Sequence, residues 1–297
     1  MKLALGTVQF GLPYGITNST GQVAQDEVIR ILQRARGLGV DVLDTAAAYG
    51  QSEAVLGCCG DVAHAFRLIT KTLPKGGAVA DADWVQQVVQ RVYTSLSNLR
   101  VQRLDGLLVH HAADLLGGSG QALYGALQEL KAAGLVERVG VSVYSVEEAI
   151  AATRRFSIDV MQLPLNVLDQ SFVRSGELQR LKERGVEIHT RSAFLQGVLL
   201  SAELPTFLQA LSPGFDRFQS ICREAGLSRL EGSLAFLRQQ HVIDQVVVGV
   251  LTQVQLEEIA GAWARSADHA ALDFSACDMA PSAAVTPSNW PALKGES

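Results

Sequence analysis

Short apolar segments alternate with longer amphipathic segments along most of the chain, and this alternation restricts the fold more than any other feature. The segments read as strands are Leu3–Val8, Val42–Asp44, Leu68–Thr70, Gly106–Val109, Val139–Val143, Val160–Leu163, Glu187–Thr190 and Val246–Val248. Helical patterns lie between them at Val28–Leu38, Trp84–Leu99, Ala122–Ala133, Glu147–Arg154, Gly176–Arg184, Leu230–Gln240 and Val254–Ala264. Strands that alternate with helices eight times predict a (β/α)8 TIM barrel rather than an open sheet.

The chain is expected to form a single domain. Its 297 residues suit one barrel, and no linker rich in proline, glycine or serine divides them. We assign residues 1–271 to the barrel. Residues 272–297 contain Pro281, Pro287 and Pro291 and lack a helical period, so we expect an irregular C-terminal tail laid over the barrel or left loose.

Charge and composition favour a protein that acts on a small molecule. The formal net charge is -5, and the chain has no run of like charges that would suit nucleic acid or an anionic membrane. No apolar stretch approaches the roughly 20 residues that span a bilayer, and the N-terminus lacks a signal-peptide pattern, so a cytoplasmic location is expected. The four cysteines lack C-x-x-C spacing, so neither a metal site nor a disulfide framework is expected. The sequence leaves the oligomeric state open.

Four residues with complementary chemistry lie at or just after the ends of predicted strands. Asp44 and Tyr49 fall in L-D-T-A-A-A-Y-G-Q-S-E, Lys71 follows the third strand, and His110 ends D-G-L-L-V-H. The carboxyl ends of barrel strands meet on one face, so these four side chains could converge on one substrate atom. A carboxylate, a phenol, an ammonium and an imidazole together predict a site that donates a proton.

Several ordered motifs resemble the aldo-keto reductase family over most of the chain, from Gly6 to about Glu258. They are D-T-A-x-x-Y-G-x-S-E at 44–53, T-K at 70–71, D-x-L-x-V-H at 105–110, G-L-V-x-x-V-G-V-S at 134–142, Q-L-x-x-N at 162–166 and G-x5-Q-x2-E at 249–258. The resemblance implies a reductase that converts an aldehyde or ketone to an alcohol by hydride transfer from NADPH, with NADH possible.

The resemblance gives the four residues catalytic roles. Tyr49 would be the general acid, and an ammonium about 4 Å away offers up to about 4 kcal/mol at an effective dielectric near 20, equivalent to almost three pKa units. Lys71 would supply that ammonium, Asp44 would hold it, and a neutral His110 would orient the carbonyl. The next residue, His111, is expected to form a wall of the substrate pocket.

No Rossmann G-x-G-x-x-G follows the first strand, so the barrel mouth is expected to hold the cofactor. By resemblance, Ser142 and Gln162 would bind the carboxamide, and Arg191 would stack on the nicotinamide or reach the pyrophosphate. The other cofactor residues implied are Thr7, Ser192, Phe194, Gln196 and Gly197, with Gly249, Thr252, Gln255 and Glu258 at the adenosine. Gly249 and Gln255 stand where many members have Lys and Arg around the 2'-phosphate, but other branches share them, so NADPH is the expectation.

Two other functions remain open. One is a cofactor-binding redox sensor or interaction subunit with slow turnover, since the same family fold serves in potassium-channel beta subunits. The other is a barrel isomerase or aldolase that forms a Schiff base at Lys71. Substrate choice is expected to depend on the loops His111–Gln121 and Leu195–Gly214 and on the tail, with Phe274 and Trp290. Because the first strand starts almost at Met1, another segment, with the tail as one candidate, is expected to cover the bottom of the barrel.

Overall fold

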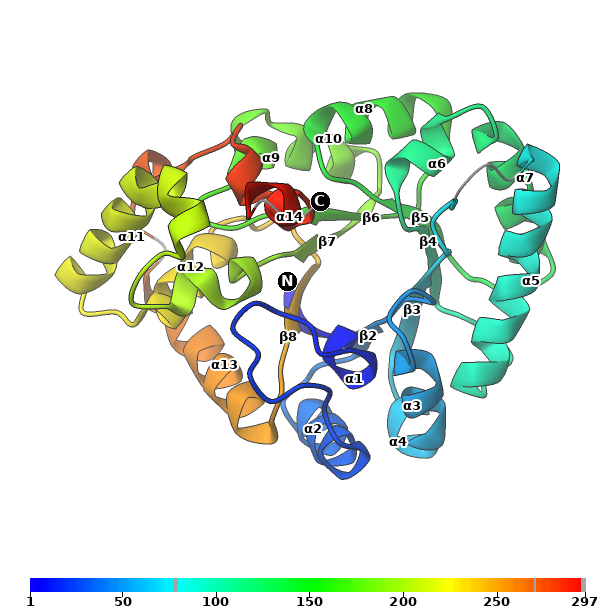
Figure 1. The fold of residues 1–297 in the computed structure, drawn as a ribbon, viewed down its shortest axis with the longest axis horizontal. Coiled ribbons are helices and arrows are strands. Elements are labelled where there is room, and N and C mark those ends of the chain that lie inside the picture. Colours follow the sequence, from blue (N-terminus) through cyan, green and yellow to red (C-terminus); the bar gives the residue numbers. More distant parts are fainter. Residues whose placement is uncertain (77–79, 270, 295–297) are drawn as a thin grey trace.

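A closed barrel of eight parallel strands forms the centre of the molecule (Figure 1). The computed structural model describes residues 1–76, 80–269 and 271–294. The strands are β1 (Lys2–Gly6), β2 (Val42–Asp44), β3 (Arg67–Lys71), β4 (Gly106–Val109), β5 (Val139–Ser142), β6 (Val160–Pro164), β7 (Glu187–Arg191) and β8 (Gln245–Gly249). They follow one another in chain order, and β1 pairs with β8 to close the ring. The predicted TIM barrel is confirmed, and all eight strands lie within about two residues of their predicted bounds.

Helices surround the barrel as an outer layer in Figure 1. The longer ones are α2 (Gln25–Gly37), α5 (Asp81–Leu99), α7 (Gly120–Ala132), α8 (Val146–Arg155), α10 (Glu177–Glu183), α11 (Ser212–Glu224), α12 (Arg229–Arg238) and α13 (Gln253–Arg265). Shorter helices are α1 (Val8–Gly11), α3 (Ser52–Cys58), α4 (Asp61–His64), α6 (Ala112–Leu116), α9 (Ser171–Arg174) and α14 (Trp290–Leu293). Within the described ranges, no helix combines the length and the apolar character needed to cross a bilayer.

One long helix was missed by the sequence analysis. Residues 195–214 were expected to form a loop, but α11 begins at Ser212, with Pro213 in its first turn. Proline is tolerated there because the first backbone N–H groups of a helix have no partner inside the helix. The rest of the segment forms two 3-10 helices, η1 (Leu195–Leu200) and η2 (Thr206–Leu211), so the expected loop is largely ordered as short helical turns.

The barrel interior is built in layers because alternate strand residues point inward. The middle layer is an apolar cluster of Ala4, Val42, Ile69, Leu108, Val160 and Val247. Two positions later along β2 and β3 come Asp44 and Lys71, both at the carboxyl ends of their strands. The apolar layer therefore separates the carboxyl end of the barrel, with Asp44 and Lys71, from the opposite end.

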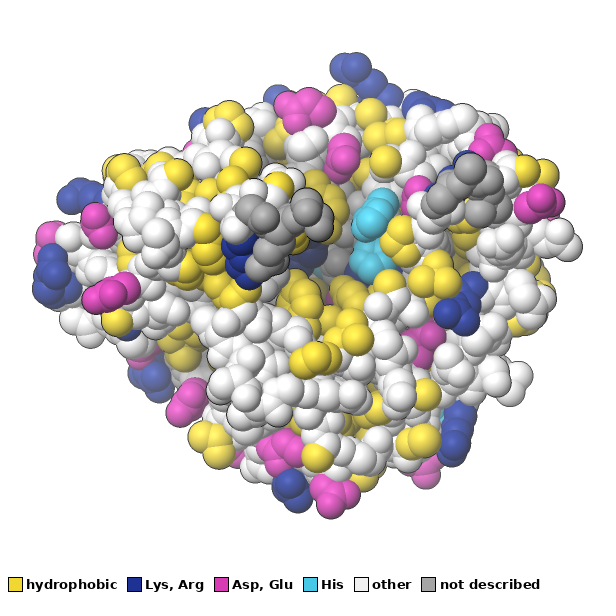
Figure 2. Space-filling view, in the orientation of Figure 1, with side chains coloured by type: hydrophobic (Ala, Val, Ile, Leu, Met, Phe, Trp, Pro, Cys, Tyr) yellow, Lys and Arg dark blue, Asp and Glu magenta, His cyan; other side chains and the backbone are white. Residues whose placement is uncertain are grey.

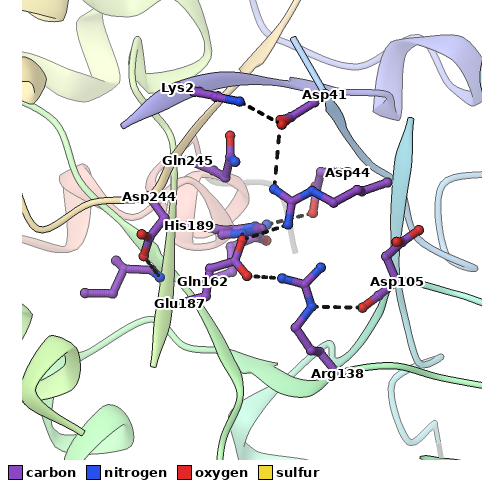
Figure 3. A network of polar contacts seen from close by, with 12 residues as sticks. Lys2, Asp41, Asp44, Asp105, Arg138, Gln162, Glu187, His189, Asp244 and Gln245 are labelled. Atoms are coloured by element: carbon purple, nitrogen blue, oxygen red, sulfur yellow. Dashed lines mark hydrogen bonds and ion pairs between the residues drawn. The ribbon is translucent and has the colours of Figure 1, made fainter. Parts of the chain in front are cut away.

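Ionic side chains, rather than the tail, occupy the amino-terminal end of the barrel (Figure 3). Lys2 pairs with Asp41 at 3.0 Å, and Glu187 pairs with Arg67 at 3.3 Å and also with Arg138. Burial raises the pKa of Glu187, but hydrogen bonding to His189 and the charges of the two arginines outweigh burial and lower it to about 2. Glu187 is therefore a carboxylate at neutral pH and holds the two arginines together.

The tail lies at the other end of the barrel, so the tail was the wrong candidate for covering the bottom. Met279 N–H donates to the Leu168 carbonyl, just after β6, and the ring of Trp290 lies 5.7 Å from that of Phe207 in η2. Phe274 and Trp290 are each 2% exposed. Neither lines the main cavity, so they stabilise the tail by burial and do not form a substrate wall.

Candidate active site

The four predicted catalytic residues converge at the carboxyl end of the barrel. Lys71 Nζ at the end of β3 donates to Asp44 Oδ2 at 2.7 Å and to the Thr45 carbonyl at 2.9 Å. It also lies 3.4 Å from Tyr49 Oη, in the segment between β2 and α3. The ring of His110, just after β4, lies 5.9 Å from the Tyr49 ring in an edge-to-face arrangement. The structure thus brings together the carboxylate, ammonium, phenol and imidazole that the sequence predicted.

Burial dominates the acidity of Tyr49. Burial raises the pKa of its hydroxyl above 10, and the attraction of Lys71 opposes this without reversing it. The sequence predicted that the ammonium would lower this pKa, but burial outweighs the attraction of Lys71, and the Asp44 carboxylate also repels a phenolate. Tyr49 is therefore protonated at neutral pH, which is the form that can donate a proton.

Lys71 and Asp44 form a buried ion pair. Their side chains are 1% and 5% exposed. Burial lowers the pKa of Lys71, but Asp44 and Tyr49 together outweigh it and raise the pKa above its ordinary value. Lys71 is thus held as an ammonium that points at Tyr49.

His110 is neutral, as predicted. Burial, followed by the charge of Lys71 and the electrostatic effect of the neighbouring His111, lowers its pKa to about 3. Its Nδ1 atom is buried and has no partner among the described residues, whereas the residue lines the main cavity. Nε2 is therefore the ring nitrogen left to meet a substrate oxygen.

A cavity of about 530 Å³ opens beside these residues. Asp44, Tyr49 and His110 line it, whereas Lys71 lies behind them. Its wall includes the following residues that the sequence analysis assigned to a cofactor: Thr7, Ser142, Gln162, Arg191, Ser192, Phe194, Gln196, Gly197, Gly249, Gln255 and Glu258. Histidine side chains gather near the middle of the face shown in Figure 2, beside hydrophobic side chains. The volume is within the range of small-molecule and cofactor sites.

Two predicted site residues do not line this cavity. Thr252 is the N-cap of α13, where its hydroxyl accepts a hydrogen bond from the Gln255 N–H at 3.2 Å. His111 is exposed, and its ring lies 5.2 Å from the His110 ring, outside the cavity wall. Thr252 thus has a structural role that its sequence position did not reveal.

Gln162 contacts the buried ion pair of Lys71 and Asp44 directly. Its Nε2 donates to Asp44 Oδ1 at 2.7 Å, while Lys71 binds the other carboxylate oxygen. Both carboxylate oxygens of Asp44 therefore have a donor. Thr7 is also engaged inside the protein, because its hydroxyl donates to the Asp44 carbonyl at 3.1 Å and accepts from Ser52.

Arg191 stacks on a tyrosine that the sequence analysis missed. Its guanidinium carbon lies 4.1 Å from the centre of the Tyr144 ring, and Nη2 donates to the Val143 carbonyl at 3.0 Å. Tyr144 also lines the cavity. The only sequence signal was an aromatic residue two positions after Ser142, at the end of a predicted strand.

A segment after β1 crosses to the loop after β7 and narrows the cavity. Tyr14 Oη accepts from Gln196 Nε2 at 3.0 Å, and Thr17 Oγ1 donates to the Gln196 carbonyl at 3.2 Å. Ser192, Leu195 and Gln196 all have positive φ angles, an unusual strain for residues other than glycine. The sequence analysis assigned no role to Tyr14 or Thr17.

The donors around the cavity suit a nicotinamide dinucleotide. Ser142 and Gln162 offer hydrogen-bonding groups for an amide at the catalytic end. Arg191 offers a cation for a phosphate, beside the hydroxyl of Ser192. No group of three described His, Cys, Asp or Glu side chains is placed to hold a metal ion.

Comparisons with known proteins show one matching family and several structures with a similar fold. Residues 2–276 match the model of the "Aldo/keto reductase family". No curated protein matches at a significant level. Among solved structures, PA4992 of Pseudomonas aeruginosa, assigned to the aldo-keto reductases, shares 24% identity over 89% of this chain and 90% of that one, with a TM-score of 0.67. The holo form of an aldo-keto reductase from Bacillus halodurans shares 18% identity over 93% and 94%, with a TM-score of 0.68.

A third similar structure is a glycerol dehydrogenase from Gluconobacter oxydans. It shares 17% identity over 90% of this chain and 89% of that chain, with a TM-score of 0.64. At such identities, the likeness to these structures shows the fold alone.

Proposed function

The chain belongs to the aldo/keto reductase family, and from this premise we propose that it reduces an aldehyde or ketone to an alcohol with a nicotinamide dinucleotide as hydride donor. The observation that carries the proposal is the position of Lys71 Nζ, 2.7 Å from Asp44 and 3.4 Å from Tyr49. A buried ammonium that contacts a protonated phenol suits a proton donor whose conjugate base must be stabilised.

When bound, a nicotinamide cofactor would supply the hydride for the carbonyl carbon. Tyr49 donates its phenolic proton to the carbonyl oxygen as negative charge develops there, so the product is an alcohol. Lys71 then stabilises the phenolate, and Asp44 keeps Lys71 charged. His110 is neutral, and its Nε2–H donates a hydrogen bond that orients the carbonyl oxygen.

The proposed cofactor site extends from the catalytic end to α13. Ser142 and Gln162 would bind the carboxamide, Arg191 and Ser192 would face the phosphates, and Gly249, Gln255 and Glu258 would face the adenosine. The family's usual cofactor, NADPH, is the expectation from sequence, with NADH as the alternative. Small-molecule carbonyl compounds are the proposed substrates.

The burial of Lys71 argues against Schiff-base chemistry. Its Nζ makes hydrogen bonds to Asp44, Thr45 and Tyr49, its side chain is 1% exposed, and it does not line the cavity. A Schiff base needs an accessible neutral amine, whereas the pKa of Lys71 is raised. Borohydride treatment in the presence of a carbonyl substrate should therefore leave Lys71 unmodified.

The test is the variant Tyr49→Phe, assayed with a panel of aldehydes. Loss of general acid catalysis should lower the reduction rate at least about a hundredfold while cofactor binding is retained. Tyr93→Phe is a matched control, because Tyr93 lies on α5 and is 48% exposed. A Tyr49→Phe enzyme that works at the parent rate would show that Tyr49 is not the acid. If the parent binds cofactor but turns over only very slowly on every aldehyde, the sensor function would be favoured instead.

A further inference from the structure

The adenosine end of the proposed site has a charge pattern that bears on cofactor choice. Gly249, Gln255 and Glu258 line the same cavity as Tyr49. Under the proposed function, on which this inference rests, they face the ribose that carries a hydroxyl in NADH and a 2'-phosphate in NADPH. The groups beside that ribose therefore determine which cofactor binds more tightly.

Gln9 occupies the space in which a side chain at position 249 would lie. A Cβ atom built on Gly249 would come within 2.6 Å of Gln9 Nε2 and 2.8 Å of Gln9 Oε1. Gln9 itself lines the cavity, and its amide is uncharged. A lysine at position 249 would therefore require Gln9 to move. Gln9, which fills the space of such a side chain, brings no positive charge.

The other polar groups at this end cannot neutralise a phosphate. The side-chain amide oxygen of Gln255, Oε1, accepts a hydrogen bond from the Leu251 N–H at 2.8 Å, so only the NH2 group of this amide is left for a ligand. Glu258, one turn further along α13, contributes a side-chain carboxyl group to the cavity wall. A ribose hydroxyl can donate a hydrogen bond to a carboxylate, whereas a phosphate is repelled by it.

Three chain segments that contribute to the cavity wall contain neither lysine nor arginine: residues 3–29, 192–216 and 239–264. Another contributor, Leu230, directly follows Arg229. Among the described residues that line the cavity, Arg191 is the one Lys or Arg side chain, and it stacks on Tyr144 beside the catalytic residues. Arg229 donates to the Leu200 carbonyl at 3.1 Å and lines a separate hollow.

We infer that this site favours NADH over NADPH, because the polar side chains at its adenosine end, Gln9, Gln255 and Glu258, are uncharged or acidic and offer a 2'-phosphate no cationic partner among the described residues there. This preference departs from the NADPH expectation that the sequence resemblance suggested. The preference is electrostatic, so it weakens as salt screens the charges.

Fluorescence titration of the full chain with NADH and with NADPH tests the inference. Like charges placed side by side repel, and solvent screening reduces this repulsion, so the dissociation constant of NADH should be lower by at least about tenfold. The ratio of the two constants should fall toward one as sodium chloride is added. NADPH binding that is equal or tighter would overturn the inference and leave the proposed function intact. If neither cofactor binds, the proposed function fails and this inference fails with it.

The variant Gln255→Arg tests the position of the 2'-group. A guanidinium there should tighten NADPH binding by about tenfold, the effect of one charge-assisted hydrogen bond, with little change for NADH. Val254→Arg is the matched control, because Val254 is 61% exposed, lies on the same turn of α13 and does not line the cavity. A shift confined to Gln255→Arg supports the inference. An equal shift in both variants, or none in Gln255→Arg, would overturn the placement of the 2'-group.

Discussion

Replacement of Lys71 by methionine should slow the chemical step by a predictable amount. Lys71 Nζ lies 3.4 Å from Tyr49 Oη. Two unit charges about 4 Å apart attract by about 4 kcal/mol at an effective dielectric near 20. If the phenol oxygen carries about half a charge in the transition state, the ammonium contributes about 2 kcal/mol, or about thirtyfold in rate.

The Asp44 carboxylate should make the rate of the single variant fall by more than about thirtyfold, because it still repels the phenolate. It should also make that variant less stable. Without Lys71, Asp44 keeps one donor, Gln162, but loses its counter-ion, and an uncompensated buried charge costs about 3–5 kcal/mol of stability. The double variant Asp44→Asn, Lys71→Met removes both charges and is the matched control. Its rate should fall by about thirtyfold or less, because the repulsion by Asp44 is lost together with the attraction by Lys71.

Single-turnover hydride transfer, followed by nicotinamide absorbance at saturating cofactor, measures the chemical step directly. Urea unfolding of each variant shows whether the protein is folded under the assay conditions. The expected order of rates is parent, double variant, single variant. A folded Lys71→Met protein that transfers hydride within about threefold of the parent rate would refute the argument, since about thirtyfold or more is expected.

Two further predictions concern pH. The pKa of His110 is about 3, and that of Tyr49 lies above 10. Therefore kcat/KM for reduction should be flat between about pH 5 and about pH 8 and should fall only as Tyr49 loses its proton at higher pH. A change in rate centred near pH 6.5 would mean that His110 titrates there and would contradict the prediction. Glu187 has a pKa of about 2 against an ordinary 4.5, so its ion pairs stabilise the fold above pH 4.5 and are lost as the pH falls toward 2. Glu187→Gln should therefore lower the free energy of unfolding by about 3 kcal/mol near pH 7 and by much less near about pH 3, with the exposed Glu183→Gln as control; equal losses in urea unfolding at both pH values would contradict the ion-pair argument.

The strand pattern and the catalytic residues were accessible from sequence for the same physical reason. A strand such as β6 (Val160–Pro164) is covered on both faces, so it appears as a short apolar run between longer amphipathic segments. The carboxyl ends of parallel strands meet at one end of a barrel, so residues at those ends can be placed without coordinates. Asp44, Tyr49 and Lys71 were placed in this way, whereas the choice of His110 over the adjacent His111 rested on the family resemblance.

Contacts between segments distant in the chain were not accessible. The hydrogen bond from Gln162 to Asp44 joins residues 118 positions apart. The stacking of Arg191 on Tyr144 depends on how the last residue of β7 lies relative to the loop after β5. Thr252 was assigned to the cofactor because its position fits the motif, but it caps α13. A motif gives a residue's order in the chain, whereas a cap or a stack depends on backbone angles and on neighbours in space.

The amino-acid sequence by itself determined the barrel and the four residues of the candidate catalytic site, because periodic burial and strand order are local properties of the chain. Only the tertiary structure decided the environment of those residues. Tyr49 keeps its proton because burial outweighs the attraction of Lys71, and the tail packs beside β6 rather than under the barrel. Desolvation and long-range packing depend on all neighbouring atoms at once, and no short segment of sequence contains them.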